Sequence, residues 1–268
     1  MQIRALTWNL YHGRDGPPDP GLFTARSKWL RITERDATHV QVNRDLYRDF
    51  ARLLCSAAWD VALLQECPPR WRRRLERDCG ADAHRVLTAR NWFRPVSGWL
   101  ATVNPDLIGA WEGGSNTTLV RGAAGEIVER RSAVIHRHFP ERRTMAFTRL
   151  SSGLCVANLH ATTRWQRAAD QVLRAAAQAI AWAQGSPLIL GGDFNVRPRQ
   201  SPVYEALRER FGLVPPTAPD SIDHLLARGL QQLEPPRPWP EEAREIPFEG
   251  LALRLSDHAP VEAVLRIA

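Results

Sequence analysis

The feature that most constrains the fold is a series of short, apolar, β-prone segments that end in polar side chains. Residues 3–9 alternate in polarity and predict a first strand that ends at Asn9. Residues 61–64 predict a buried strand with Glu66 just beyond it, and residues 187–190 predict another that leads to Asp193. In open α/β folds the strand ends present side chains to a cleft. We therefore expect polar groups from distant parts of the chain to meet in one site.

Further segments fit the same mixed α/β pattern. Apolar residues at helical spacing predict helices over 42–58, 71–75 and 164–184, the last capped by Thr162 or Thr163 and ended by Gly185. Strands are predicted over 117–120, 133–136, 145–150, 154–159 and 261–267, and loops over 13–21 and 233–250. The sequence shows no internal repeat and no linker, so we expect residues 1–268 to form one α/β domain.

The polar residues near the strand ends form one chemical set. They are Asn9, Glu66, His160, Asp193, Asn195, Asp257 and His258, with Asp223 and His224 after a short loop. Carboxylate, amide and imidazole groups of this kind suit a hard cation such as Mg²⁺ or Mn²⁺ rather than a thiolate-bound zinc. The pattern therefore indicates a metal-assisted site.

The chain is basic, with a formal net charge of +7 at pH 7. This charge favours an anionic partner through long-range attraction. Lys28 is the only lysine, so arginine supplies almost all of the positive charge, and such a bias also arises from genome composition. The charge supports an anionic substrate, but alone it does not identify nucleic acid.

The four cysteines, Cys55, Cys67, Cys79 and Cys155, show no C-x-x-C spacing and are few for a disulfide scaffold. We expect free, mostly buried thiols in a reducing compartment. The N-terminal segment is typical of a strand rather than a signal peptide, and no apolar run is long enough to span a bilayer. These features predict a cytoplasmic, monomeric protein without a membrane span.

Six motifs support a resemblance to a known superfamily. They are Thr7-Trp8-Asn9, Leu64-Gln65-Glu66, Asn158-Leu159-His160, Gly192-Asp193-Phe194-Asn195, Ile222-Asp223-His224 and Ser256-Asp257-His258-Ala259-Pro260-Val261. In this order, and spread over nearly the whole chain, they resemble the endonuclease/exonuclease/phosphatase superfamily, of which DNase I is a member. Any one motif is weak, whereas all six in order are specific. The resemblance implies a four-layer α/β sandwich, with two mixed β-sheets packed face to face and helices outside.

The resemblance also implies a metal site and a phosphate contact. Glu66 would bind the catalytic Mg²⁺ or Mn²⁺, and Asn9 and Asp257 would complete or support its ligand shell. The cation would neutralise charge on the phosphate oxygens as the transition state forms. Asn116 lies before a strand, where many members carry a phosphate-contacting asparagine.

The same resemblance implies the acid–base roles. Asp193 would orient or deprotonate the attacking water, and Asn195 would hold that water or a phosphoryl oxygen. His258 would contact the phosphate or transfer a proton, oriented by the carboxylate of Asp223, which would raise the pKa of the imidazole. His160 would act as a general acid or as a phosphate ligand.

Single residues among these also have structural explanations. Asn9 could cap a turn, and His160 could bond to backbone in a turn. Asp193, by contrast, has little structural reason to follow an apolar strand. We expect His224 to be structural, and the histidines outside the motifs, His12 among them, to be ordinary surface or packing residues.

The superfamily covers several kinds of phosphate ester, so the fold does not define the substrate. Gln65-Glu66-Cys67-Pro68 departs from the Q-E-T-K motif of typical abasic-site endonucleases, and the chain lacks the aromatic hairpin expected of a secreted sphingomyelinase. The basic charge makes a nucleic-acid phosphodiesterase the leading interpretation. The alternatives are a phosphoesterase acting on a small molecule or lipid headgroup, and a non-catalytic binding module with this fold.

Overall fold

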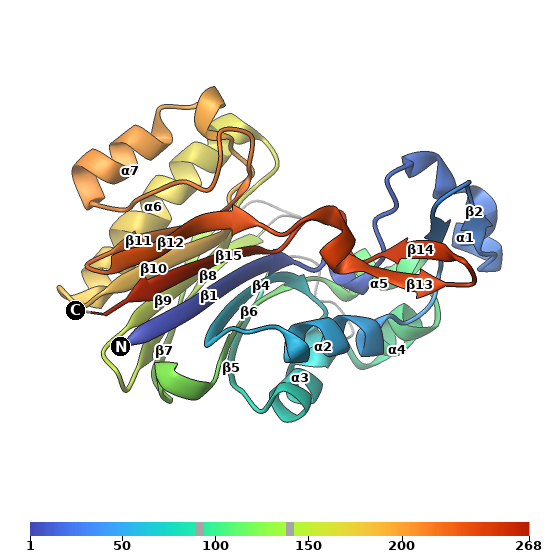
Figure 1. Ribbon diagram of the computed structural model, residues 1–268, viewed down its shortest axis with the longest axis horizontal. Helices are drawn as coiled ribbons and strands as arrows, with labels where there is room; N and C mark the ends of the chain where they lie inside the picture. Colours follow the sequence, from blue (N-terminus) through green and yellow to red (C-terminus); the bar gives the residue numbers. More distant parts are fainter. Residues whose placement is uncertain (89–93, 138–141, 268) are drawn as a thin grey trace.

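Two β-sheets form the centre of the computed structural model, which describes residues 1–88, 94–137 and 142–267 (Figure 1). The six-stranded sheet has the order β12-β15-β1-β4-β6-β5, and the five-stranded sheet has the order β11-β10-β9-β8-β7. The strands of the first sheet are β1 (Gln2–Asn9), β4 (Val61–Cys67), β5 (Asp82–Leu87), β6 (Ser115–Val120), β12 (Gln231–Pro238) and β15 (Val261–Arg266). Those of the second are β7 (Ile127–Arg137), β8 (Arg142–Leu150), β9 (Cys155–His160), β10 (Leu188–Asp193) and β11 (Asp223–Arg228). Both sheets are mixed, because β1 runs parallel to β4 but antiparallel to β15, and β10 runs parallel to β9 but antiparallel to β11.

The sheets pack face to face, and helices cover their outer faces. Apolar side chains meet between the sheets, among them Ile3 and Leu63 from one and Val156 and Ile189 from the other. The five-stranded sheet is covered by α6 (Trp165–Ala183) and α7 (Val203–Phe211), and the six-stranded sheet by α2 (Tyr47–Ser56) and α3 (Arg72–Cys79). The four-layer α/β sandwich expected from the sequence is confirmed.

The close approach of β10 to its neighbours requires glycine at two consecutive positions. A Cβ on Gly192, whose φ is +135°, would lie 1.9 Å from the carbonyl oxygen of Leu159. A Cβ on Gly191 would lie 2.8 Å from Leu225 Cδ2. Because only glycine fits here, the two residues before Asp193 fix where that carboxylate leaves the sheet.

A buried polar link joins the two sheets beneath the strand ends. Gln65 Nε2 donates to Asn158 Oδ1 at 2.8 Å. Asn158 Nδ2 donates to the carbonyl oxygens of Leu64 and Thr117, at 3.2 Å each. Since buried amides are costly unless they are hydrogen-bonded, these bonds set the position of β4 relative to β9.

A smaller group of elements lies beyond one end of the sheets, on the side away from α6 and α7 (Figure 1). It contains α1 (Ala25–Leu30), α4 (Arg94–Val103), α5 (Pro105–Glu112), the short pair β2 (Glu34–Arg35) and β3 (Val40–Gln41), and the hairpin β13 (Glu245–Phe248) with β14 (Leu251–Arg254). A Cβ on Gly109 of α5 would lie 3.6 Å from the Cβ of His12, in the turn after β1. This group therefore borders the polar strand ends.

Two helix starts differ from the predictions. The helix predicted over 42–58 begins at Tyr47. Residues 42–46, between β3 and this helix, are irregular, and the N–H of Val42 donates to the carboxylate of Asp15. The N-cap residue of α6 is Arg164, which makes no side-chain capping bond, so neither Thr162 nor Thr163 is the N-cap as predicted. The N–H of Thr162 donates to the Gln171 side chain of that helix.

The loop predicted over 233–250 is wrong in part, since it contains most of β12 and all of β13. β12 is an edge strand, and its register against β15 is irregular. Edge strands tolerate proline because one side of their backbone needs no ladder hydrogen bonds. The prolines that suggested a loop therefore lie in an irregular edge strand.

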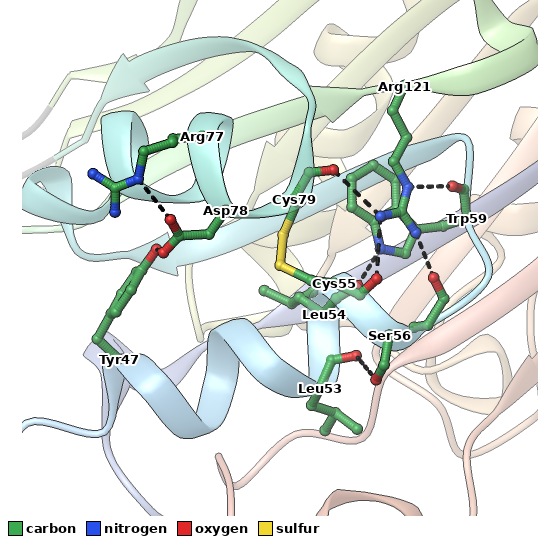
Figure 2. Close-up of a disulfide and its surroundings, with 11 residues drawn as sticks. Tyr47, Leu53, Leu54, Cys55, Ser56, Trp59, Arg77, Asp78, Cys79 and Arg121 are labelled. Carbon is green, nitrogen blue, oxygen red and sulfur yellow. Dashed lines mark hydrogen bonds and ion pairs between the residues drawn. A yellow bond between two sulfur atoms is a disulfide. The ribbon is translucent and has the colours of Figure 1, made fainter.

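The expectation of four free thiols is wrong for two of them. Cys55 at the end of α2 and Cys79 at the end of α3 form a disulfide, with 4.7 Å between their Cα atoms (Figure 2). The two residues are 24 positions apart, so no short cysteine spacing in the sequence indicated the disulfide. Cys67 and Cys155 are free and buried, as expected.

Arg121 stabilises the segments around the disulfide. Its guanidinium donates to the carbonyl oxygens of Cys55, Cys79 and Trp59 and lies 3.8 Å above the Trp59 ring (Figure 2).

The disulfide removes the argument for a reducing compartment that rested on free thiols. No helix in the described part of the chain has both the length and the apolarity needed to cross a membrane.

Candidate active site

The predicted site residues converge although they come from different strands of both sheets. Asn9, His160 and Asp193 are the last residues of β1, β9 and β10. Glu66 is the next-to-last residue of β4, and Asp223 is the first residue of β11. Because β11 runs antiparallel to β10, its beginning lies at the edge of the sheet where β10 ends.

Asp193 lies at the centre of the contacts. Its Oδ2 accepts a hydrogen bond of 2.9 Å from Asn9 Nδ2, and its Oδ1 accepts one of 3.0 Å from the N–H of Asn195. The same Oδ2 lies 3.4 Å from His160 Nε2 and 3.9 Å from His258 Nε2. One carboxylate therefore connects two amides and two imidazoles.

His258, in the connection from β14 to β15, is oriented by Asp223. Its Nδ1 lies 2.8 Å from Asp223 Oδ2, and its carbonyl oxygen accepts a bond from Trp8 Nε1 at 2.9 Å. Burial disfavours the imidazolium, but the carboxylates of Asp223 and Asp193 outweigh this effect and raise the pKa of His258 well above its ordinary value. His258 is thus a protonated donor aimed at Asp193.

Asp193 itself is a carboxyl group suited to proton transfer. Burial raises its pKa to about 7, and the charge of Asp223 adds to this effect. The positive charge of His258 and the hydrogen bond from Asn9 act in the opposite direction. A base whose pKa lies near neutral pH combines availability with driving force for proton abstraction.

Glu66 faces imidazoles from two directions. Its Oε2 lies 3.3 Å from His12 Nε2, and its Oε1 lies 3.9 Å from His160 Nδ1. Burial acts to raise its pKa, whereas the charges of protonated His12 and His258 and of Arg14 lower it. Glu66 therefore remains an anion at any physiological pH.

His160 differs from His258 in its protonation. Burial lowers the pKa of His160 well below its ordinary value, and the nearby charge of Arg143 lowers it further. Its imidazole is neutral at neutral pH, between the carboxylates of Glu66 and Asp193. The site thus holds one charged and one neutral imidazole.

The acidic groups fit a hard divalent cation on the Glu66 side. Partial burial raises the pKa of Asp257, His258 opposes this, and the charge of Glu66 raises it further. Two carboxylates that repel one another in this way are stabilised by a cation with oxygen ligands. Among the described residues, Asp193, Asp223 and His258 offer possible ligand atoms within 4.8 Å of one another, but His258 is protonated and already bonded to Asp223. A protonated imidazole does not ligate a metal.

Backbone strain is concentrated around these side chains. Of the eight non-glycine residues with positive φ in the described chain, five lie at the site, namely Tyr11, His12, Glu66, Asn195 and Ser256, with φ between 46° and 62°. Such conformations cost about 1–3 kcal/mol each and persist only where the surroundings enforce them. The fold therefore maintains these positions at a cost in stability.

His12 was missed by the sequence analysis, which placed it among ordinary surface or packing histidines. It lies in the turn η1 (Tyr11–Gly13) and contacts Glu66. A Cβ on Gly13 would lie 2.5 Å from Trp71, so the turn packs tightly and directs His12 into the site. The sequence did contain one indication that His12 lies at the site, because His12 and Gly13 closely follow the predicted end of the first strand.

Other predicted residues lie around the site in different ways. Asn195 Nδ2 donates to the carbonyl oxygen of Ala161, which holds the amide beside Asp193. The buried Asn116 donates to the carbonyl oxygen of Thr144, and no hydrogen bond among the described residues joins it to the carboxylates or imidazoles.

His224 has a structural position, as expected. It is fully buried, stacks between Phe194 and Tyr204, and accepts a hydrogen bond from the N–H of Thr217. Burial lowers its pKa to about 4. His224 is therefore neutral and packs behind the site.

Comparison with known proteins agrees with this geometry. The model of the endonuclease/exonuclease/phosphatase family matches residues 6–258, and the chain belongs to this family. It is accordingly a phosphoesterase by family, and the superfamily resemblance seen in the motifs is confirmed. A search of curated proteins gives no match.

Solved structures share the fold at low sequence identity. A family protein from Bacteroides thetaiotaomicron is 15% identical, with a TM-score of 0.64 over 99% of this chain and 95% of its own. A mannosyl-6-phosphatase from the same species is 15% identical, with a TM-score of 0.62 over 98% of this chain and 99% of its own. TDP2 from Caenorhabditis elegans is 14% identical, with a TM-score of 0.57 over 99% of this chain and 74% of its own. At such identities the similarity shows the fold alone.

Proposed function

We propose that the protein is a divalent-metal-dependent phosphodiesterase whose substrate is a nucleic acid. The observation that carries the proposal is the series from Asp223 through His258 to Asp193. It places a carboxyl group with a pKa of about 7 within 3.9 Å of an imidazole whose pKa is raised. A base whose pKa lies near neutral pH and a protonated imidazole directed at it are what ester hydrolysis by water requires.

The metal would be held by Glu66 and Asp257, in agreement with the resemblance. Asn9 would support the shell indirectly, since its amide already bonds to Asp193 and accepts from the N–H of Tyr11. When bound, Mg²⁺ or Mn²⁺ supplies neutralisation of charge on the phosphate oxygens. The anionic state of Glu66 keeps this position ready for a cation.

Asp193 would receive the proton of the attacking water. Its two oxygens are held by Asn9 and by the N–H of Asn195, so the orientation of the carboxylate is fixed. Asn195 would hold the water or a phosphoryl oxygen at the same point.

His258 would donate to a phosphoryl oxygen and so balance the charge that develops during attack. The Asp223 carboxylate keeps Nδ1 occupied and leaves Nε2–H directed toward the substrate. The neutral His160 would bind a second phosphoryl oxygen or protonate the leaving oxygen. General acid–base help of this kind contributes about 10²–10⁴ in rate.

The choice of nucleic acid rests on charge. The chain has a net charge of +7, which attracts polyanions over distances longer than direct contacts. We propose that the protein acts on such a substrate as a monomer.

A second candidate is hydrolysis of a phosphate ester on a small molecule. The observation in its favour is the structural similarity to a mannosyl-6-phosphatase, whose whole length the chain nearly covers. The two candidates use the same acid and base, and they differ in how the rest of the substrate is bound.

A substrate panel tests the proposal. Plasmid DNA, single-stranded DNA and RNA, a bis-aryl phosphate, sugar phosphates, inositol phosphates and sphingomyelin are incubated with Mg²⁺ or Mn²⁺, with and without a chelator. We expect chelator-sensitive cleavage of nucleic acid with a steep loss of affinity at high salt. Cleavage of sugar phosphates alone, with a shallow salt dependence, would favour the second candidate.

A further inference from the structure

Arg14 carries a guanidinium group near the proposed metal ligands. The residue directly follows η1 and is half-buried. Its guanidinium carbon lies 3.8 Å from the centre of the Tyr11 ring, and its Nε donates to the carbonyl oxygen of Tyr11 at 3.3 Å. Within the described ranges, no carboxylate forms an ion pair with Arg14.

The backbone fixes Arg14 beside the proposed metal ligands. Its carbonyl oxygen accepts a hydrogen bond of 3.1 Å from the N–H of Ser256, the residue before Asp257. On the other side, the N–H of Tyr11 donates to Asn9 Oδ1 at 3.0 Å. Burial has the largest effect on the pKa values of Asp106, Glu66 and Asp257 and acts to raise them. The positive charge of Arg14 opposes this, most strongly at Asp106 and more weakly at Glu66 and Asp257.

Two other arginines close to this region, Arg70 and Arg254, are occupied. Arg70 pairs with Glu112 and Asp45, and Arg254 bonds to Glu241 and to the carbonyl oxygen of Gly16. Arg14 instead has its inner nitrogen bonded and its plane fixed by an aromatic ring. Its two terminal nitrogens are left to form the planar fork that binds two phosphate oxygens at once.

Arg14 lies apart from the proposed acid–base groups. Asp193, His258 and His160 act on the water and the leaving oxygen, whereas the charge of Arg14 acts on Asp106, Glu66 and Asp257. We propose that Arg14 binds the phosphate next to the scissile one in a phosphodiester chain. This inference rests on the proposed function and makes Arg14 a specificity residue that distinguishes a nucleic-acid strand from a substrate with one phosphate.

The test compares two substrates that differ by one phosphate. One is a dinucleoside monophosphate, and the other carries an additional terminal phosphate, capped as a methyl ester, at its 5′ or 3′ end. Steady-state kcat and KM are measured with Mn²⁺ for the wild type, Arg14→Ala and Arg14→Lys. Arg208→Ala is the control, because Arg208 lies exposed on α7 beside Glu205 and Glu209.

We expect the wild type to prefer one of the two-phosphate isomers, mainly through a lower KM. Arg14→Ala should reduce this preference about tenfold, which is the effect of losing one charge-assisted contact. Arg14→Lys should keep part of it, because lysine retains the charge without the fork. Arg208→Ala should keep all of it.

The two possible failures are distinct. If the wild type cleaves both substrates and Arg14→Ala lowers both rates by the same factor, Arg14 acts on the metal ligands or the scissile phosphate, and the inference is wrong. If the wild type cleaves neither substrate but hydrolyses a sugar phosphate, the proposed function is wrong and the inference is lost with it.

Discussion

Asn9 Nδ2 donates a 2.9 Å hydrogen bond to Asp193 Oδ2 and so joins the last residue of β1 to the last residue of β10. The two strands belong to different sheets. The position of the proposed base therefore depends on how the sheets pack, and the buried Gln65–Asn158 bond below it fixes the same packing. The acid–base geometry is thus a property of the whole sandwich.

Replacing Asn9 by alanine should move the acidic limb of the pH–rate profile to higher pH. The Asn9 bond stabilises the ionised Asp193 carboxylate and lowers its pKa. Without it the pKa should exceed about 7, and the deprotonated base should form only about one pH unit higher. The profile of kcat between pH 5 and 9 measures this shift. An unchanged limb would show that Asp193 does not titrate in catalysis.

Replacing Asp223 by asparagine should move both limbs to lower pH. The charge of Asp223 raises the pKa of His258 and also that of Asp193. Its loss should therefore let His258 lose its proton earlier on the alkaline side and let Asp193 ionise earlier on the acidic side. We also expect kcat to fall by about a hundredfold, because the imidazole loses its orientation. A variant that retains full activity above pH 8 would contradict the role of Asp223.

Asp193→Asn should lose about 10²–10⁴ in rate yet be more stable than the wild type at pH 8. The folded-state pKa of about 7 lies above the ordinary value of 3.8, so the native state binds the proton more tightly than the unfolded state. Stability therefore falls as the pH rises from about 4 to about 7, and the amide removes this loss, by up to about 4 kcal/mol. Urea unfolding in chelator at pH 5 and pH 8 measures the difference. A variant that is equally destabilised at both pH values would contradict the raised pKa.

The disulfide predicts a defined thiol count and a stability loss on reduction. Unfolded, non-reduced protein should react at Cys67 and Cys155 only, and full reduction should add Cys55 and Cys79. Because the bond closes a loop of 24 residues, its removal by Cys55→Ser should cost about 3 kcal/mol. Thiol titration with mass spectrometry and urea unfolding check the two effects. Four reactive thiols before reduction would show that the pair does not form.

Much of the site could be predicted from the sequence, because its reactive side chains lie at the ends of predicted strands. Alternation and apolar runs place Asn9, Glu66 and Asp193 at one edge, and the structure brings them together. His12 was not predicted, since its direction depends on a strained turn packed against Trp71 rather than on a periodic pattern.

Tertiary contacts explain the rest of what was missed. The Cys55–Cys79 pair forms because α2 and α3 pack side by side, which local spacing does not encode. Proline made the β12 region resemble a loop, although an edge strand can accommodate it. The sequence did not indicate a role for Arg14. That role is inferred from the packing of its guanidinium on the Tyr11 ring and from the absence of an ion pair with a carboxylate among the described residues.

The most direct measurement is kcat/KM for the wild type, Asp193→Asn, His258→Gln and the double variant, on whichever phosphodiester the panel identifies, with and without chelator. We predict that each single variant loses about 10²–10⁴ in kcat/KM. The double variant should be only slightly less active than the less active single variant, because the two groups act as a unit. Metal-dependent hydrolysis that survives in either single variant at nearly the wild-type rate would contradict the proposed acid–base pair.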